Sequence, residues 1–496
     1  MAILRTCVAT AAIVALVMIG ARAENEIAPP EGDTGGGQQT RPAPSPVPVG
    51  GLRRLPTVSD IDWDAFPDPH DPAFGGRRQI TLSPGEPGVI GTALSQARPG
   101  DTILLRGGTY REGIEDDHRA LPILYDGIAI CALAGQRARI VPRSSEVTCG
   151  VAIQASNVLL QGLTIEGFSS VGIGIEKEGQ TLKNIVLIDL QVKMPADDEW
   201  HDGIVLYHDN RAIGRPASDG LRMHRVTVEN ASLGISCNAG PCRSWWLEDV
   251  TVVGRGGDGS GADAIAVEEG ENIVMHRVNV SKSAADGIDL KAKRVLISSS
   301  RVHNVARNGI KLWHGGDIVN TVIHHTGADA AIVFEQGGRY RILNSVMAFH
   351  NYPGPASYNL TAGYDSREKL QVELINSIFF RTSGGMFFQD GTTVKVEHCI
   401  FHDMTNGELL RTQIRGEEVS LNTEAGAGAF TQSGIGTGVI LADPEFVDPD
   451  GGDFRLTRSS PGANRGIRVS DMPAVDIADT ARIKGGAPDI GAFECW

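Results

Sequence analysis

The stretch 286–313, DGIDLKAKRVLISSSRVHNVARNGIKLW, contains the repeat that decides the fold. Its first segment, DGIDLK (286–291), returns 22 residues later as NGIKLW (308–313), with Lys311 in the place that Asp289 has in the first copy. Related segments precede them: DGIVL (202–206), LGISC (233–237) and DAIAV (263–267). A period of about two dozen residues has no room for a crossover helix, so it predicts a parallel β-solenoid of stacked coils.

Alternation along these segments assigns the faces of the strands. The inward columns are Ile204, Ile235, Ile265, Ile288, Ile310 and Leu206, Cys237, Val267, Leu290, Leu312. The outward columns are Val205, Ser236, Ala266, Asp289, Lys311 and Tyr207, Asn238, Glu268, Lys291, Trp313. Stacked strands lie about 4.8 Å apart, so Asp289 and Lys311 are expected to be neighbours on the outer face.

The two ends of the repeat region fit an all-β solenoid with covered edges. Residues 87–99 (PGVIGTALSQARP) are expected to form a short amphipathic helix that caps the first coil, since an open sheet edge recruits other chains. The next segment, GDTILLRGGTY (100–110), resembles the entry of secreted right-handed parallel β-helix proteins, and the segments 442–456 and 486–494 resemble their C-terminal end. The resemblance implies a right-handed parallel β-helix with an N-terminal capping helix.

Five parts are expected along the chain: a signal peptide at 1–23, a disordered Pro/Gly-rich linker at 24–50, an N-terminal extension at 51–79, the parallel β-helix at 80–440 and a C-terminal tail at 441–496. The first part has a basic start, an apolar run and a small-residue end, which is typical of a cleavable secretory signal. An N-terminal membrane anchor is the alternative. We therefore expect a secreted or periplasmic protein.

Charge and composition limit the partners. The formal net charge is −15, and loss of Arg5 and Arg22 with the signal leaves 43 basic against 60 acidic residues, or −17. An acidic chain of this size is a poor nucleic-acid binder, and it repels a polyanion unless a local charge reverses the field. No other segment is apolar enough to span a membrane, and we expect the mature chain to be a monomer.

Six cysteines remain once the signal is removed: Cys131, Cys149, Cys237, Cys242, Cys399 and Cys495. An even number in an exported chain permits disulfides, and the nearest pairs in sequence are Cys131–Cys149 and Cys237–Cys242. The inward position of Cys237 argues against the second pair, so the pairing stays open.

Three aspartates are expected to gather beside Lys311. Asp263 and Asp286 begin consecutive coils, and Asp289 lies within a strand, where aspartate is disfavoured. Clustered carboxylates favour a hard cation such as Ca²⁺, which takes oxygen ligands and water. Two ordinary explanations stay open: turn-forming aspartates that hydrogen-bond the backbone, and a solvated ion pair of Asp289 with Lys311 that is worth less than about 1 kcal/mol.

The segments ADGIDL (285–290) and RNGIKLW (307–313) resemble the calcium-dependent pectate lyases of polysaccharide lyase family 9. In that family an Asp-Asp-Gly-Phe-Asp-Leu strand, with one more Asp from the preceding coil, holds calcium. A following Asn-Gly-Phe-Lys-Leu strand supplies the catalytic lysine. The specific resemblance covers 260–335, and the loop between the two strands is shorter here than in the family.

Carried over by position, the resemblance implies that Asp263, Asp286 and Asp289 hold Ca²⁺ and that Lys311 is the catalytic base. Ala285 stands where the family has the first Asp of its pair, so water or a neighbouring side chain would supply that ligand. The implied reaction is β-elimination on a uronate-containing, pectate-like polysaccharide. A cation on the uronate carboxylate would stabilise the enediolate-like transition state while the lysine removes the C5 proton.

Five further residues are candidates for substrate binding. Tyr207 and Trp313 stand on the outer face, where an aromatic ring can stack on a sugar. Lys291 flanks the aspartate cluster, His314 follows the candidate base, and Arg339 lies one coil further on and can bind a second carboxylate. His314 as an exposed loop residue and Arg339 in a surface ion pair are the ordinary alternatives.

Other functions on the same fold remain open. A glycoside hydrolase would use two carboxylates, such as Asp286 and Asp289, but would leave Lys311 without a role. A uronate epimerase shares the proton abstraction and differs in returning a proton. A non-catalytic glycan-binding or surface protein would bind the polymer without releasing unsaturated products.

Overall fold

The computed structural model describes residues 61–68, 73–113, 117–207, 215–238, 240–327, 330–351, 358–363, 368–414 and 416–495. The expected signal peptide and linker, and part of the expected extension, lie outside the described residues. No helix within the described ranges is both long and apolar enough to cross a membrane.

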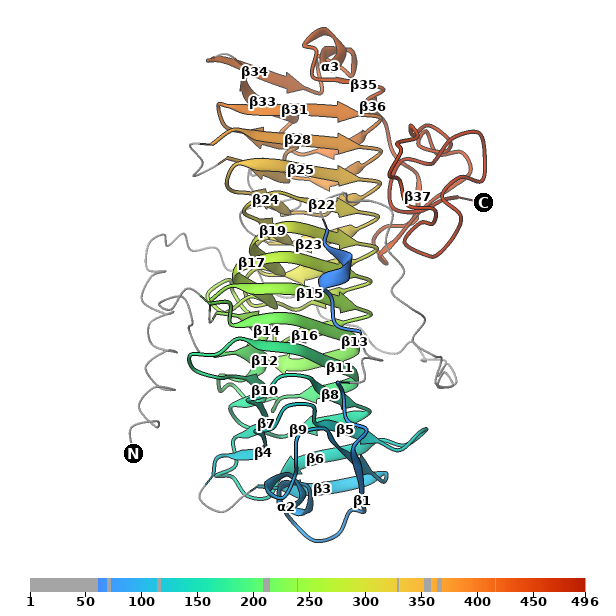
Figure 1. Ribbon diagram of the computed structural model, residues 1–496. Coiled ribbons are helices and arrows are strands. Elements are labelled where there is room, and N and C mark those ends of the chain that lie inside the picture. Colours follow the sequence, from blue (N-terminus) through green and yellow to red (C-terminus); the bar gives the residue numbers. More distant parts are fainter. Residues whose placement is uncertain are drawn as a thin grey trace. The chain divides into compact units, whose positions relative to one another are not determined.

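The described chain winds into a parallel β-helix with three faces, and 36 of its strands belong to one continuous sheet. Figure 1 shows the coils stacked in chain order. The first face comprises β4 (Arg119–Ile123), β7 (Cys149–Ile153), β10 (Val171–Ile175), β12 (Asp202–Leu206), β14 (Leu233–Cys237), the first halves of β17 (Ile265–His276) and β19 (Ile288–Ser298), β21 (Ile310–Leu312), β24 (Ile332–Phe334), β27 (Leu360–Ala362), β30 (Met386–Phe388) and β33 (Glu408–Ile414).

The other two faces follow the same order of coils. The second face comprises β1 (Arg78–Leu82), β2 (Asp101–Leu105), β5 (Ala129–Ala132), β8 (Val158–Gln161), the first halves of β11 (Leu182–Lys193) and β13 (Ser218–Ala231), β15 (Cys242–Glu248), the second halves of β17 and β19, β22 (Gly316–Val319), β25 (Gly338–Leu343), β28 (Leu370–Ile375), β31 (Thr392–Glu397) and β35 (Gly436–Thr437). The third face comprises β3 (Gly108–Glu112), β6 (Ala138–Pro142), β9 (Leu163–Glu166), the second halves of β11 and β13, β16 (Thr251–Gly254), β18 (Asn279–Ser281), β20 (Arg301–Val305), β23 (Val322–Thr326), β26 (Val346–Ala348), β29 (Ile378–Thr382), β32 (Ile400–Met404) and β36 (Ile440–Leu441).

The core is built from columns of like residues. Ile204, Ile235, Ile265, Ile288 and Ile310 are opposite one another in register and are fully buried. The column that begins at Leu206 is likewise buried. Both predicted inward columns are therefore confirmed, because a period-2 strand with one buried face tolerates only one register.

Cys237 and Cys242 form a disulfide in the core, although the inward position of Cys237 seemed to argue against it. That expectation was wrong, because Cys242 is also fully buried and the turn between β14 and β15 brings both side chains to the interior. Cys131 and Cys149, the other pair close in sequence, are free thiols. Burial raises the pKa of each of these two to about 12.

Short elements cover the two ends of the coil stack. The helix α2 (Val89–Ser95) lies within the expected segment 87–99 and packs Ile90 and Leu94 into the core. At the other end β33 pairs antiparallel with β34 (Glu417–Asn422), and α3 (Gly428–Gln432) buries Phe430 (Figure 1). The capping expectation for the first coil is confirmed.

Two segments outside the coils lie against them. The 3-10 helix η2 (Trp63–Ala65) belongs to an apolar cluster with Trp246 of β15. The C-terminal tail contains the small hairpin β37 (Phe446–Asp448) and β38 (Asp453–Leu456). Turn asparagines of the coils hold this tail: Asn320 and Asn376 donate to the carbonyls of Val475 (2.8 Å) and Ile467 (2.9 Å).

We predict that Ile288→Ala lowers the free energy of unfolding by about 2–5 kcal/mol, because it opens a cavity in a closely stacked column. Denaturant unfolding followed by circular dichroism measures the loss. Val447→Ala, at a side chain that is 48% exposed, is the control and should change stability by less than about 0.5 kcal/mol. Equal stability of the two variants would contradict the assigned register.

Candidate active site

Asp263, Asp286 and Asp289 meet on the first face, where two successive coils begin their strands. Asp263 lies two residues before β17, and Asp286 lies two residues before β19, in which Asp289 lies. One carboxylate oxygen from each residue lies within 4.8 Å of the others. The structure thus brings together the three aspartates that the sequence predicted as metal ligands.

Two of these aspartates also hydrogen-bond the backbone of a turn, which was the alternative explanation for them. Asp263 Oδ1 accepts the backbone N–H of Asp286 at 2.9 Å. Asp286 Oδ1 accepts the backbone and side-chain N–H groups of Asn308 at 3.0 and 2.9 Å. These hydrogen bonds involve only Oδ1 of each carboxylate. The second oxygen can still bind a metal ion, so the two roles are compatible.

Burial makes this cluster unfavourable for three bare carboxylates. It raises the pKa of Asp263 to about 8, with additional repulsion from Asp286 and Asp289. It also raises the pKa of Asp286, and it raises that of Asp289 to about 6 even though Lys311 acts in the opposite direction. Oxygen ligands in a buried anionic cluster suit a hard divalent cation, because its charge offsets their mutual repulsion.

Lys311 lies directly opposite Asp289 on the next strand, as the repeat spacing predicts. Its ammonium group forms an ion pair with Glu335 at 3.0 Å, and the Glu335 side chain is 8% exposed. Burial alone would lower the pKa of Lys311, but Asp289 and Glu335 outweigh it and raise this pKa. Lys311 is therefore an ammonium as long as both carboxylates carry uncompensated charge.

Trp313, an expected surface for sugar stacking, also contacts the aspartate cluster. Its indole Nε1 donates to Asp289 Oδ1 at 2.7 Å. The ammonium groups of Lys291 and Lys311 lie 5.2 and 4.9 Å from its ring centroid, and Lys291 also forms an ion pair with Glu268. Half-buried Trp313 thus holds Asp289 and packs against both lysines.

A second aromatic group lies on the same face, next to β12, which is two coils before β17. Tyr207 is 40% exposed, and its hydroxyl donates to Asp202 at 3.2 Å. Trp200 is 49% exposed and donates to the same carboxylate at 2.8 Å. The sequence analysis missed Trp200, because it precedes the repeat segment and has no counterpart in the other coils.

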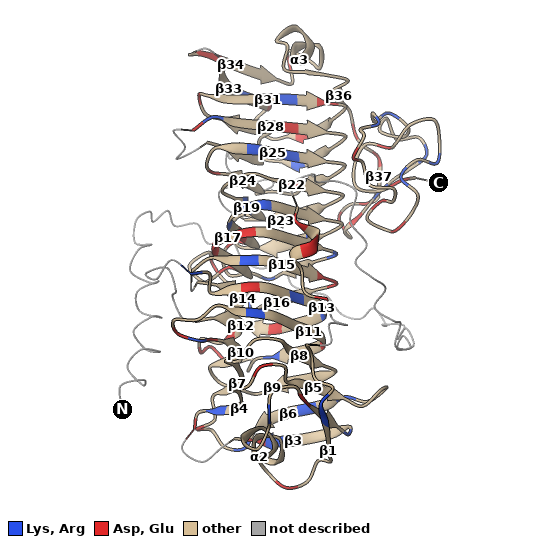
Figure 2. Ribbon diagram, in the orientation of Figure 1, with Lys and Arg blue, Asp and Glu red and all other residues tan. Residues whose placement is uncertain are grey.

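The remaining two substrate-binding candidates, Arg339 and His314, lie in different surroundings from Trp313 and Lys291. Arg339 lies on β25 of the second face and forms an ion pair with Glu373 at 2.9 Å, as its alternative interpretation held. Figure 2 shows that basic and acidic positions follow one another from strand to strand on this face. His314 is half-buried in the turn between β21 and β22, and burial lowers its pKa, with a smaller contribution from Lys293.

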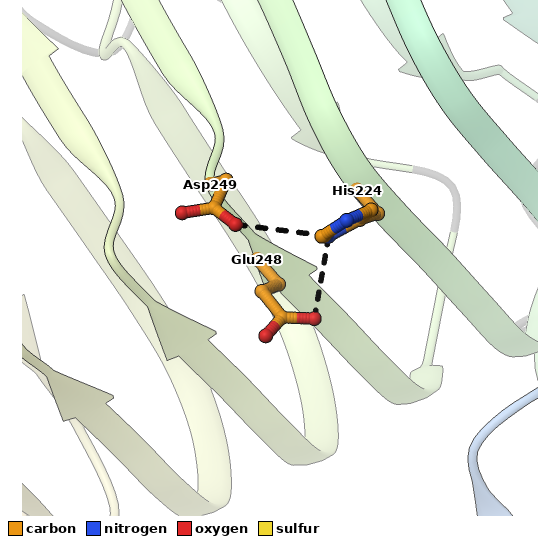
Figure 3. A group of neighbouring side chains, drawn as sticks. All are labelled: His224, Glu248 and Asp249. Atoms are coloured by element: carbon orange, nitrogen blue, oxygen red, sulfur yellow. Dashed lines mark ion pairs between the residues drawn. The ribbon is translucent and has the colours of Figure 1, made fainter. Parts of the chain in front are cut away.

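Another group with metal-ligand atoms, which the sequence analysis also missed, comprises His224, Glu248 and Asp249 (Figure 3). His224 Nδ1 lies 3.3 Å from Glu248 and 3.8 Å from Asp249. Arg277 already contacts both carboxylates, Asp249 at 2.5 Å and Glu248 at 3.1 Å. Arg222 is a further cation near Glu248, at 3.6 Å.

These neighbours exclude a cation site at Glu248 on charge grounds. Burial would raise the pKa of Glu248, but His224, Arg277 and Arg222 outweigh it and hold the pKa at about 2. Both carboxylates are already paired with guanidinium groups. This group therefore stabilises the stacked turns, whereas the aspartate cluster on the first face keeps its charge repulsion.

Comparison with known proteins agrees with this architecture. A family model described as a right handed beta helix region matches residues 249–434, which confirms the right-handed parallel β-helix expected from the sequence. No curated protein sequence matches the chain.

Three similar solved structures are all distant in sequence. Pectate lyase Pel9A is 13% identical, with 88% of this chain and 98% of that chain covered and a TM-score of 0.48. The A-module of mannuronan C-5 epimerase AlgE6 from Azotobacter vinelandii is 14% identical over 72% and 93% of the two chains, with a TM-score of 0.46. The alginate lyase from Paenibacillus sp. str. FPU-7 is 15% identical over 64% and 99%, with a TM-score of 0.32. At these identities the likeness concerns the fold alone.

We predict a calcium-dependent change of stability with pH that comes from the aspartate cluster. The raised pKa values stabilise the folded state below the unfolded pKa of about 3.8, and this contribution is lost as pH rises through about 6 for Asp289 and about 8 for Asp263. In chelator, the melting temperature should therefore fall between pH 5 and pH 9. Added Ca²⁺ should raise it at pH 9 and leave it unchanged at pH 5.

Differential scanning fluorimetry of the wild type and Asp263→Asn tests this dependence. The variant removes the most strongly shifted carboxylate, so its melting temperature in chelator should change less between pH 5 and pH 9. A calcium effect of equal size at both pH values would show that the cation acts elsewhere.

Proposed function

We propose that this protein is an exported polysaccharide lyase that cleaves a uronate-containing, pectate-like glycan by calcium-assisted β-elimination. The observation that carries the proposal is the placement of Lys311 opposite Asp289, one strand beyond a buried cluster of three aspartates. A base and an anionic ligand set at this spacing can engage the C5 proton and the carboxylate of the same uronate residue.

In this proposal Asp263, Asp286 and Asp289 hold the cation, and the glycan lies across the outer face. When bound, Ca²⁺ offsets the negative charge of the uronate carboxylate and makes its C5 proton more acidic. The charges on Asp289 and Asp286 would then be compensated, which removes two of the three carboxylate contributions that raise the pKa of Lys311, including the largest single one, from Asp289. Lys311 can thus lose its proton and act as a base.

The proposed elimination needs no co-reactant other than water. The neutral Nζ of Lys311 takes the C5 proton, and the C5–H electron pair forms the C4–C5 double bond. The C4–O bond breaks, its electron pair leaves with the oxygen, and water supplies the proton to that oxygen. Glu335 holds the Lys311 ammonium that results, at the 3.0 Å distance seen in the structure.

The substrate class follows from the charges near the base. The chain has a formal net charge of −15, so an acidic polymer needs local positive charge in order to bind. Lys291, Lys311 and the proposed calcium ion supply it, and the exposed Tyr207 and Trp200 offer aromatic surface further along the same face. We further propose that the mature protein acts as a secreted or periplasmic monomer.

We predict that Lys311→Ala reduces the rate of unsaturated-product formation by at least about 100-fold, because loss of a general base typically costs this much. The measurement is the ultraviolet absorbance of the unsaturated uronate, with polygalacturonate, alginate and glucuronan as substrates. Lys293→Ala, which removes a lysine from the second face, is the matched control and should keep full activity. Unchanged turnover in Lys311→Ala would contradict the assignment of the base.

We predict that Asp289→Asn weakens Ca²⁺ binding by at least about tenfold, since it removes one anionic ligand while an amide oxygen can still accept the bond from Trp313. Calorimetric titration with Ca²⁺ measures this directly. Asp202→Asn, the same substitution at the start of β12, should bind Ca²⁺ as the wild type does.

In the activity measurement, a product with inverted C5 configuration and no double bond would instead identify an epimerase.

A further inference from the structure

A pocket of about 310 Å³ opens near the C-terminal end of the coil stack. Its lining comes from β30 and the turn that follows it, and from the hairpin β33–β34, and includes Phe387, Gln389, Asp390, Arg411, Gln413 and Glu418. None of these residues has a part in the site described above. The pocket therefore needs its own explanation.

The pocket lies on the same outward column as Lys311. Strand register links Lys311 in turn to Val333, Thr361, Phe387 and Arg411. Phe387 is thus three strands beyond Lys311, or about 14 Å at the usual strand spacing. The residues between them in this column, Val333 and Thr361, have short side chains, and Val333 is 7% exposed.

The side chains of the pocket match a sugar unit. Phe387 is half-buried and offers an aromatic surface, and Tyr358 supports it by stacking at a centroid distance of 5.2 Å. Gln389, Asp390 and Gln413 supply donors and acceptors for sugar hydroxyls. An apolar aromatic wall with a few polar groups is the usual composition of a site that orients a small ligand.

A charged side chain at the pocket adds support. Arg411 is paired with Glu408 at 2.8 Å, but its side chain is 45% exposed and can also meet a carboxylate.

We infer that this pocket is a distal subsite for a sugar unit of the same glycan chain whose reacting uronate lies at Lys311. The inference rests on the proposed function and deepens it. A chain that occupies both places runs along the stack of coils and extends several units beyond the cleavage point. The enzyme should therefore favour long chains, and oligosaccharides too short to reach Phe387 should bind weakly.

Calorimetric binding to Lys311→Ala protein, which retains the surface but lacks the proposed base, tests the inference without turnover. The ligands are saturated oligogalacturonides and oligomannuronates from dimers to octamers, with Ca²⁺ present. Affinity should rise once the chain is long enough to span from Lys311 to Phe387. A second change, Phe387→Ala, should lower the affinity for the long oligomers by about tenfold and leave that for dimers unchanged.

Two further variants guard against a simple folding defect. Gln413→Ala changes an exposed pocket residue and should also reduce the length dependence. Tyr125→Ala, at an exposed aromatic residue beyond β4, is the matched control and should not. Equal affinity of the Phe387→Ala and parent proteins for every length would overturn the subsite. Length-dependent binding without any unsaturated product from the wild type would overturn the lyase but keep the subsite.

Discussion

In-register stacking of parallel strands is the constraint on which the rest of the structure depends. Each residue of one coil has a fixed neighbour about 4.8 Å away on the next, so a residue type that fits one coil tends to recur in the same place. The isoleucine column from Ile204 to Ile310 is the clearest result. A slip by one residue would turn this entire column to solvent, which is why the register is so strongly specified.

The same stacking decides where charges meet. At one set of turns, Asp189, Arg225, Asp249 and Arg277 follow one another in left-handed backbone conformations, and each aspartate forms an ion pair with the following arginine. Alternating charges in such a ladder compensate one another. On the first face the column instead brings Asp263 next to Asp286, and burial then raises the pKa of both.

This contrast separates two carboxylate clusters that look alike by ligand count. Arginines surround His224, Glu248 and Asp249 and form ion pairs with the two carboxylates. Together with His224 they hold the pKa of Glu248 at about 2, so Glu248 stays ionised. Among the three aspartates near Lys311, Arg307 and Lys311 lower the pKa of Asp286, but they do not outweigh its burial. Protons or a bound cation would relieve the repulsion that remains. Under the proposed function, a cation that relieves this repulsion would also lower the barrier to removal of a proton beside a carboxylate, with Lys311 one strand further on as the base.

The sequence by itself determined the coil period, the inward columns and the neighbouring positions of Asp289 and Lys311, because a repeat with period-2 strands has one stacking that buries its apolar residues. It did not reveal the Lys311–Glu335 pair, the contact of Trp313 with Asp289, the Cys237–Cys242 disulfide or the second face on which Arg339 lies. These features depend on how each turn redirects the chain from one face to the next, and turn lengths differ from coil to coil. Only the tertiary structure decided them, because side-chain partners across a corner follow from the path of the backbone and not from the repeat.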